Sequence, residues 1–262
     1  MSKGLQAIGM HKRFGGVHAL DDAAISVEPG RVTGLIGRNG SGKTTLFNCI
    51  TGFIVPDGGS VTVDGRDITG AGPQTIVKAG LSRTFQTPRE DARSTVRDAV
   101  LCGCYVQSSA SFLGALAGLP GARREERRIG LRADALLERF GLAAQAEAPV
   151  GTLSMGLVRL VEVARAIASG ARYLLLDEPA AGLSAAEQDI LSAQIRAVAS
   201  SGVGVLLVEH NFSLVLSMCD RITVLEFGKV LSEGTPEQVA RDPGVIEAYL
   251  GAVERGDTGS TQ

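Results

Sequence analysis

Short apolar runs alternate with longer segments of helical pattern along most of this 262-residue chain. Residues 31–36, 81–85, 173–176 and 203–208 each predict a short buried strand. Buried strands that alternate with helices predict an α/β fold with a mostly parallel core sheet covered on both faces. Ligands of such sheets bind at the carboxyl ends of the strands. The residues that directly follow these runs are therefore the first candidates for chemistry.

A second set of strands is expected to pair antiparallel. Residues 5–10 and 23–27 alternate apolar with polar or small side chains, and residues 60–63 lead into an Asp64-Gly65 hairpin turn. Residues 221–225 and 230–233 predict a terminal strand pair around a glycine. The chain is thus expected to add an antiparallel β subdomain to the parallel core sheet.

Strand signals fade between about residues 88 and 160, which predicts a helical insertion. Residues 94–101 and 123–140 have helical patterns. The second helix carries an incomplete apolar stripe of Ile129, Leu131, Leu136, Leu137 and Phe140. The mixed-sign run at 123–128 favours a solvated helix face, with a partner-docking patch as the alternative. Residues 1–251 are expected to form one domain and 252–262 a disordered tail.

Helix starts in the last third of the chain have clear sequence signals. Ser184 with Glu187 and Thr235 with Gln238 each match a capping box. The Asp242-Pro243 pair predicts the start of one further helix, because proline favours the first helical turn.

The amino-acid composition argues against several classes of function. A net charge of −2, an aromatic content of 4% and the lack of Trp argue against a nucleic-acid binder. The four cysteines are expected to be buried thiols in a reducing compartment, since no nearby Cys or His completes a metal set. No secretory signal is evident, and the longest apolar stretch, 112–119, is too short to span a bilayer.

Residues 37–45, Gly-Arg-Asn-Gly-Ser-Gly-Lys-Thr-Thr, match the G-x-x-x-x-G-K-[ST] pattern of a phosphate-binding loop. Glycines let successive N–H groups turn toward a triphosphate, and the following helix N-terminus favours anions. Lys43 is expected to contact the β- and γ-phosphates of the triphosphate, and Thr44 is expected to hold Mg²⁺. The alternative is a glycine-rich turn between a strand and a helix. The candidate nucleotide-binding residues of this loop are Arg38, Asn39, Gly40, Ser41, Gly42, Lys43, Thr44 and Thr45.

Four more polar residues follow predicted strands at the same edge of the sheet: Gln86, Asp177, Glu178 and His210. Asp177 is expected to bind Mg²⁺, and Glu178 to polarise a water toward the γ-phosphate. Adjacent carboxylates at a buried strand end are costly without a cation or hydrogen bonds. The alternative is that one caps a helix and the other is a surface acid.

Phe14, which precedes two glycines and Val17, has two interpretations. Its ring can lie against an adenine with Val17 behind it, or it can be an ordinary core side chain.

At this point the chain resembles the ATP-binding cassette (ABC) ATPases over nearly its whole length. In that family's order, residues 37–45 are similar to Walker A, Gln86 to the Q-loop glutamine and residues 153–157 to the signature motif. Residues 173–177 resemble Walker B, Glu178 its catalytic glutamate, residues 181–184 the D-loop, and His210 the switch histidine. The resemblance implies that Phe14 stacks on adenine and that Gln86, with Thr44 and Asp177, contacts the metal. It also gives Glu178, His210, Gln86 and Lys43 catalytic roles.

Several short segments narrow the resemblance to one subfamily, the ATPases of branched-chain amino acid importers and of their urea or amide relatives. They are residues 14–20, 47–52, 67–70, 83–86 and 209–210, with 248–251 at the end. Met155 and Leu157 depart from the usual signature, and Ser184 stands where the D-loop commonly has Asp. Ser154 and Gly156, which the resemblance places against the γ-phosphate of the opposite subunit, remain.

The resemblance implies a Mg²⁺-dependent ATPase subunit that pairs head to tail with a second cassette, either a copy of itself or a paralogue. It further implies two transmembrane permease subunits, an indirect solute-binding protein, and a peripheral place on the cytoplasmic face of the inner membrane. The expected role is to energise uptake of branched-chain amino acids or related small polar solutes. The alternatives are an exporter ATPase, an ABC ATPase without transport work, and a P-loop kinase.

Overall fold

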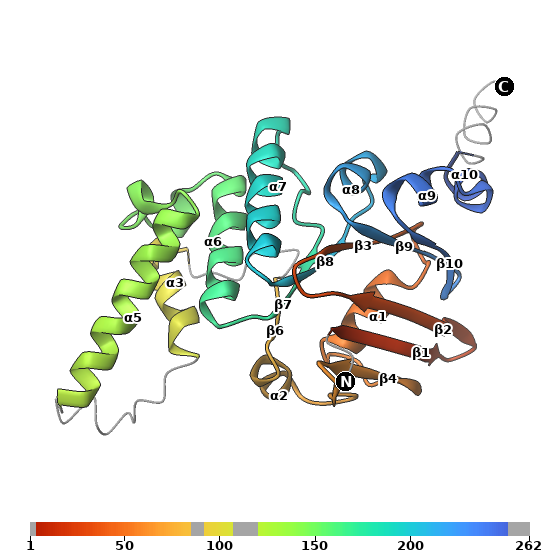
Figure 1. The fold of residues 1–262 in the computed structure, drawn as a ribbon, viewed down its shortest axis with the longest axis horizontal. Helices are drawn as coiled ribbons and strands as arrows, with labels where there is room; N and C mark the ends of the chain where they lie inside the picture. The colour runs from red at the N-terminus through yellow and green to blue at the C-terminus, as the bar shows by residue number, and fades with distance from the viewer. Residues whose placement is uncertain (1–3, 85–91, 107–119, 251–262) are drawn as a thin grey trace.

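The computed structural model describes residues 4–84, 92–106 and 120–250, which form two sheets and a set of helices (Figure 1). The larger sheet has six strands in the order β10-β9-β3-β8-β7-β6. Its strands are β3 (Val32–Gly37), β6 (Leu81–Arg83), β7 (Tyr173–Asp177), β8 (Gly204–Val208), β9 (Arg221–Glu226) and β10 (Lys229–Gly234). All neighbours are parallel except β10, which pairs antiparallel with β9. The predicted parallel core sheet is confirmed.

The smaller sheet is antiparallel, with strands in the order β2-β1-β4-β5. They are β1 (Leu5–Phe14), β2 (Val17–Val27), β4 (Gly58–Val63) and β5 (Arg66–Asp67). Strands β1 and β2 are longer than the alternating pattern predicted, since they run up to the two glycines that separate Phe14 from Val17. The turn at Asp64-Gly65 joins β4 and β5 as expected.

The core strands bury alternate side chains in two separate cores. Leu175 and Leu206 join the core that faces the antiparallel sheet and α1 (Lys43–Ile50). Leu174 and Leu207, one residue away, join the core on the opposite face. That second core is covered by helices, among them α6 (Met155–Ala168), α7 (Ala185–Ser200), α8 (Phe212–Met218) and α9 (Pro236–Ala240). Because side chains of a strand alternate between faces, fully apolar strands indicate a sheet covered on both sides.

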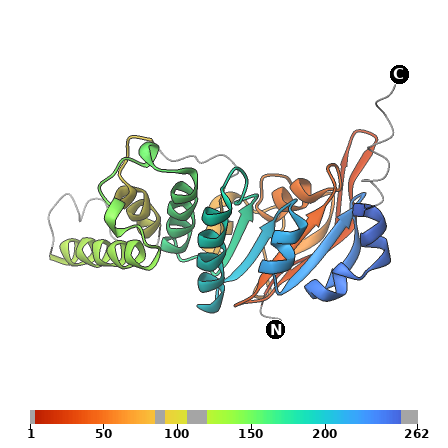
Figure 2. The same ribbon diagram turned by 90° about the horizontal axis from the view of Figure 1, so that it is seen from above.

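A helical region extends from one end of the six-stranded sheet, beyond α7 (Figures 1 and 2). It contains α3 (Val96–Tyr105), α5 (Pro120–Arg139), the 3₁₀ turns η1 (Ala143–Gln145) and η2 (Val150–Thr152), and α6. Its apolar side chains belong to the same core cluster as α7 and the sheet, so the helices are anchored to it. The remaining helices are α2 (Pro73–Lys78) and α10 (Pro243–Leu250). Within the described ranges, we find no helix both long and apolar enough to cross a membrane.

Two expectations fail in detail, and one helix was not predicted. Leu131 does not belong to the buried stripe of α5, because its side chain is exposed while Ile129, Leu136 and Leu137 are buried. Cys102 on α3 is exposed, whereas the other three cysteines are buried as expected. Helix α8 had no predicted counterpart, although Asn211 caps its first turn by accepting a hydrogen bond from the Leu214 N–H.

Candidate active site

The phosphate loop connects the end of β3 to the start of α1, and its glycines serve different purposes. Gly40 and Gly42 have φ angles of 80° and 105°, which side chains rarely allow. Gly37 has an ordinary backbone, but a Cβ there would lie 2.3 Å from the Ser41 hydroxyl oxygen. The loop therefore curls tightly over the sheet edge, as the sequence pattern predicted.

A methyl group at Gly42 is expected to destabilise the protein more than one at Gly40. A Cβ at Gly42 would lie 2.5 Å from the Ala19 carbonyl oxygen, whereas a Cβ at Gly40 meets open space. Gly40→Ala should cost only the positive-φ strain of about 1–2 kcal/mol. Gly42→Ala should add about 1–3 kcal/mol of overpacking. Urea unfolding of both variants measures the difference, and equal costs would contradict the close approach of β2 to the loop.

Two polar groups in the cradle suit a phosphate. Lys43 is only 9% exposed, and its ammonium donates to the Gly37 and Arg38 carbonyl oxygens at 2.6 and 3.1 Å. Burial lowers the pKa of Lys43, while the charges of Glu178 and Asp177 act to raise it. The Ser41 hydroxyl oxygen is buried and has no hydrogen-bond partner in the described part of the chain. A phosphate oxygen would give the Ser41 hydroxyl a partner and would pair with the charge of Lys43, so the cradle fits the ligand that the sequence predicts.

The other loop residues stand at the mouth of the cradle. Arg38, Asn39 and Thr44 are exposed, and Thr45 is half-buried. Thr44 lies in the first turn of α1, where the helix N-terminus favours anions.

Asp177 ends β7 at the same sheet edge and forms an ion pair with Arg83. Its carboxylate accepts a hydrogen bond from Arg83 at 3.1 Å, and both side chains are largely buried. Arg83 also donates to Asn48 and Thr51 of the α1 segment and lies over the Phe47 ring. Burial raises the pKa of the Asp177 carboxyl, and the positive charge of Arg83 partly offsets this. The alternative of a helix cap at Asp177 is thereby excluded.

Glu178 and His210 come together, as the strand-end argument predicted. The His210 Nδ1 lies 3.8 Å from a Glu178 carboxylate oxygen, and His210 is 63% exposed. Parallel pairing of β7 with β8 produces this contact, because the Glu178 N–H donates to the Val208 carbonyl at 2.9 Å. Glu178 has a φ of 45°, which is unusual for a residue with a side chain. Such strained backbone persists only where the surroundings hold it, and it is concentrated at functional sites.

Phe14 and Val17 face each other across the β1–β2 turn, where they form its final pair. They are 50% and 68% exposed, so Phe14 is not a core side chain. The Lys12 ammonium lies 5.7 Å from the centre of the Phe14 ring. The exposed ring remains available to stack on a base.

Ser154 and Gly156 lie at the N-terminus of α6, where Ser154 is the cap residue. In the described residues, neither hydrogen-bonds to the phosphate loop of its own chain. Gln86, the predicted Q-loop residue, lies outside the described residues.

Sequence reasoning missed two buried charged residues at the site. Arg83 was noted only as part of a family segment, yet it joins α1 to Asp177. Glu209 is 1% exposed, and its carboxylate accepts a hydrogen bond from the Ala180 N–H at 3.0 Å, which fixes the segment after Glu178. Burial raises the pKa of Glu209. Their positions in the sequence could have identified them, because both residues lie at the ends of strands and close to predicted site residues.

Comparison with known proteins agrees with this geometry. Residues 20–181 match the family model described as ABC transporter, and residues 229–255 match that of the branched-chain amino acid ATP-binding cassette transporter. The chain is 42% identical to the high-affinity branched-chain amino acid transport ATP-binding protein BraF of Pseudomonas aeruginosa, covering 94% of this chain and 97% of that protein. It is 38% identical to LivG of Escherichia coli, a protein of the same description, covering 96% of this chain and 99% of that protein.

A solved structure has the same fold. The crystal structure of an ATP-binding cassette of an ABC transporter in its ADP conformation matches with a TM-score of 0.83 and 34% identity, covering 96% of this chain and all of that one. A nucleotide-free cassette matches with a TM-score of 0.81 and 33% identity, covering 95% of this chain and 99% of that one. The chain therefore belongs to the ABC transporter ATP-binding proteins, within the family of branched-chain amino acid transport ATP-binding proteins.

Proposed function

We propose that this chain is the Mg²⁺-dependent ATPase subunit of an importer for branched-chain amino acids or related small polar solutes. This proposal rests on one observation. Four side chains lie together at one edge of a parallel sheet, namely those of Lys43, Asp177, Glu178 and His210. Full-length similarity to branched-chain amino acid transport ATP-binding proteins supports the substrate class.

In the proposed reaction, the loop around Gly40 and Ser41 binds the ATP phosphates and Lys43 neutralises their charge. Thr44, Asp177 and Gln86, which lies outside the described residues, would hold Mg²⁺, and the ion would supply positive charge to polarise the phosphates. Glu178 takes a proton from the attacking water, and His210, which lies 3.8 Å from Glu178, stabilises the transferred group. Phe14 and Val17 would hold the adenine. Catalysis is then mostly positioning and charge stabilisation.

The proposed assembly contains two cassettes, head to tail, so that Ser154 and Gly156 of one face the ATP of the other. The second cassette is a copy of this chain or a paralogue. Two permease subunits would hold the pair at the cytoplasmic face of the inner membrane, with a solute-binding protein outside. We propose the helical region as the docking face for the permeases.

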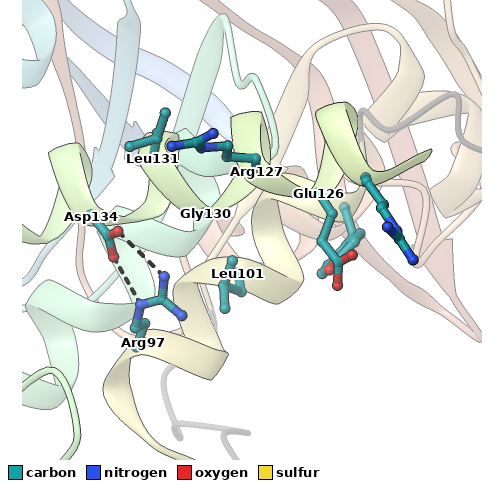
Figure 3. A pocket seen from close by; sticks show the side chains of 9 residues that line it. Arg97, Leu101, Glu126, Arg127, Gly130, Leu131 and Asp134 are labelled. Carbon is teal, nitrogen blue, oxygen red and sulfur yellow. Dashed lines mark hydrogen bonds and ion pairs between the residues drawn. The ribbon is translucent and has the colours of Figure 1, made fainter. Parts of the chain in front are cut away.

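A groove on that region supports the docking proposal. It has a volume of about 470 Å³ and lies between α3 and α5, lined by Leu101, Tyr105 and Leu131 among others. Figure 3 shows Arg97 of α3 reaching Asp134 of α5 beside it, a contact of 2.8 Å. Exposed apolar side chains rimmed by charges are typical of protein contact sites.

The test is purification of tagged protein from membranes, followed by identification of bound subunits and an ATPase assay of the complex. Two permease subunits and release of inorganic phosphate are expected. An export permease would contradict the import role. A protein without membrane partners would favour an ABC ATPase without transport work, and a phosphorylated acceptor would favour a kinase.

A further inference from the structure

One carboxylate, that of Glu187, joins the signature segment to the D-loop within the same chain. Glu187 lies in the first turn of α7, and one of its oxygens accepts from the Ser184 N–H at 3.1 Å and from the Ser184 hydroxyl at 2.8 Å. The other oxygen accepts from the Gly156 N–H at 3.3 Å. The Glu187 carboxylate thus bridges residues that are about thirty positions apart, at the starts of α6 and α7.

The same contact explains why position 156 is a glycine. Gly156 has no left-handed backbone angle, so conformation alone does not demand glycine there. A Cβ at this position would instead lie 2.8 Å from a Glu187 oxygen and 2.9 Å from its Cγ. The absence of a side chain lets Glu187 pack directly against the signature backbone.

Several donors stabilise the charged form of Glu187. Hydrogen bonds from the backbone and hydroxyl of Ser184, followed by those from the Ser154 hydroxyl and the Gly156 N–H, hold the pKa of Glu187 below its usual value. Glu187 is therefore a carboxylate at neutral pH. It contacts both Ser154 and Gly156, which our proposed function assigns to the γ-phosphate held by the opposite cassette.

We infer that Glu187 is a positioning residue for ATP hydrolysis, which holds the signature segment in register with the D-loop so that both reach the opposite cassette together. The inference rests on the proposed function. It also gives one departure from the family pattern a role, because the Ser184 hydroxyl donates one of the hydrogen bonds that fix Glu187.

The test compares the turnover of the assembled complex with the nucleotide affinity of the isolated subunit. Glu187→Ala should lower kcat about tenfold or more, because hydrogen bonds to a charged group are lost at a site where position matters. The affinity of the isolated subunit for ATP should not change, since the hydrogen bonds described for Glu187 go to the starts of α6 and α7 and not to the phosphate loop. Glu187→Gln, which keeps one acceptor oxygen, should have an intermediate kcat. Asp189→Ala, an exposed acid on the same helix, is the matched control and should resemble wild type.

A stability measurement provides a second, independent test. Gly156→Ala should lower the melting temperature of the wild-type subunit, but much less in a Glu187→Ala background, where the side chain that it would strike is gone. Additive effects of the two substitutions, or an unchanged kcat in Glu187→Ala, would overturn the inference. A wild-type complex without ATPase activity would instead overturn the proposed function, and the inference with it.

Discussion

Glu178→Gln is expected to abolish turnover while leaving ATP binding intact. The amide has the shape of the carboxylate but is a very poor base, so it cannot accept the proton of the attacking water. The rate of phosphate release should fall at least about a hundredfold, within the range of about 10²–10⁴ that general bases contribute. Phosphate release by the purified complex gives the rate, and equilibrium binding of a fluorescent ATP analogue gives the affinity.

The structure suggests that this substitution is well tolerated. Glutamine at 178 can keep the left-handed backbone, because the hydrogen bond from the residue 178 N–H to the Val208 carbonyl does not depend on the side chain. Glu138→Gln, an exposed change on α5, is the control and should hydrolyse ATP normally. Near-normal hydrolysis by Glu178→Gln would remove Glu178 from the role of base and direct attention to His210 beside it.

Local patterns in the sequence predicted the elements that carry the site. The strand, glycine loop and helix around Lys43 were confirmed, because each depends on residues adjacent in the chain. Both capping boxes were confirmed for the same reason. The edge that collects Asp177, Glu178 and His210 also followed from pattern, since parallel strands place their carboxyl ends together.

The features that could not be predicted depend on contacts between distant segments. Arg83 binds Asp177 across 94 residues of chain. Nothing in the local pattern around either residue specifies that pair. Leu131 matched a helical stripe, but α5 is covered by neighbours on only part of its surface, and Leu131 lies outside that part. Helix α8 has seven residues, too few to give a clear helical period.

The second large effect is expected for the buried charge of Lys43. The Lys43→Ala protein should lose its affinity for ATP but should remain folded. The ammonium is held by the Gly37 and Arg38 carbonyl oxygens. Folding disfavours its charge, because burial lowers the pKa of Lys43 below the unfolded value. Since the unfolded chain then binds the proton more tightly than the folded one, this charge destabilises the fold at neutral pH. Removing it should leave the melting temperature nearly unchanged, because the loss of the hydrogen bonds to the Gly37 and Arg38 carbonyl oxygens offsets the gain.

ATP reverses that balance, because its β- and γ-phosphates add negative charge beside the Lys43 ammonium. Hydrogen bonds to charged groups contribute about 1.5–3 kcal/mol each, so ATP binding should weaken about 10- to 100-fold or more. Titration calorimetry with Mg·ATP measures the loss, and Lys78→Ala, an exposed lysine on α2, serves as the control. ADP, which lacks the γ-phosphate, should lose less affinity than ATP. A Lys43→Ala protein that melts normally and still binds Mg·ATP as tightly as wild type would show that residues 37–45 are a structural turn. The buried Ser41 hydroxyl, which has no hydrogen-bond partner in the described part of the chain, argues against that outcome.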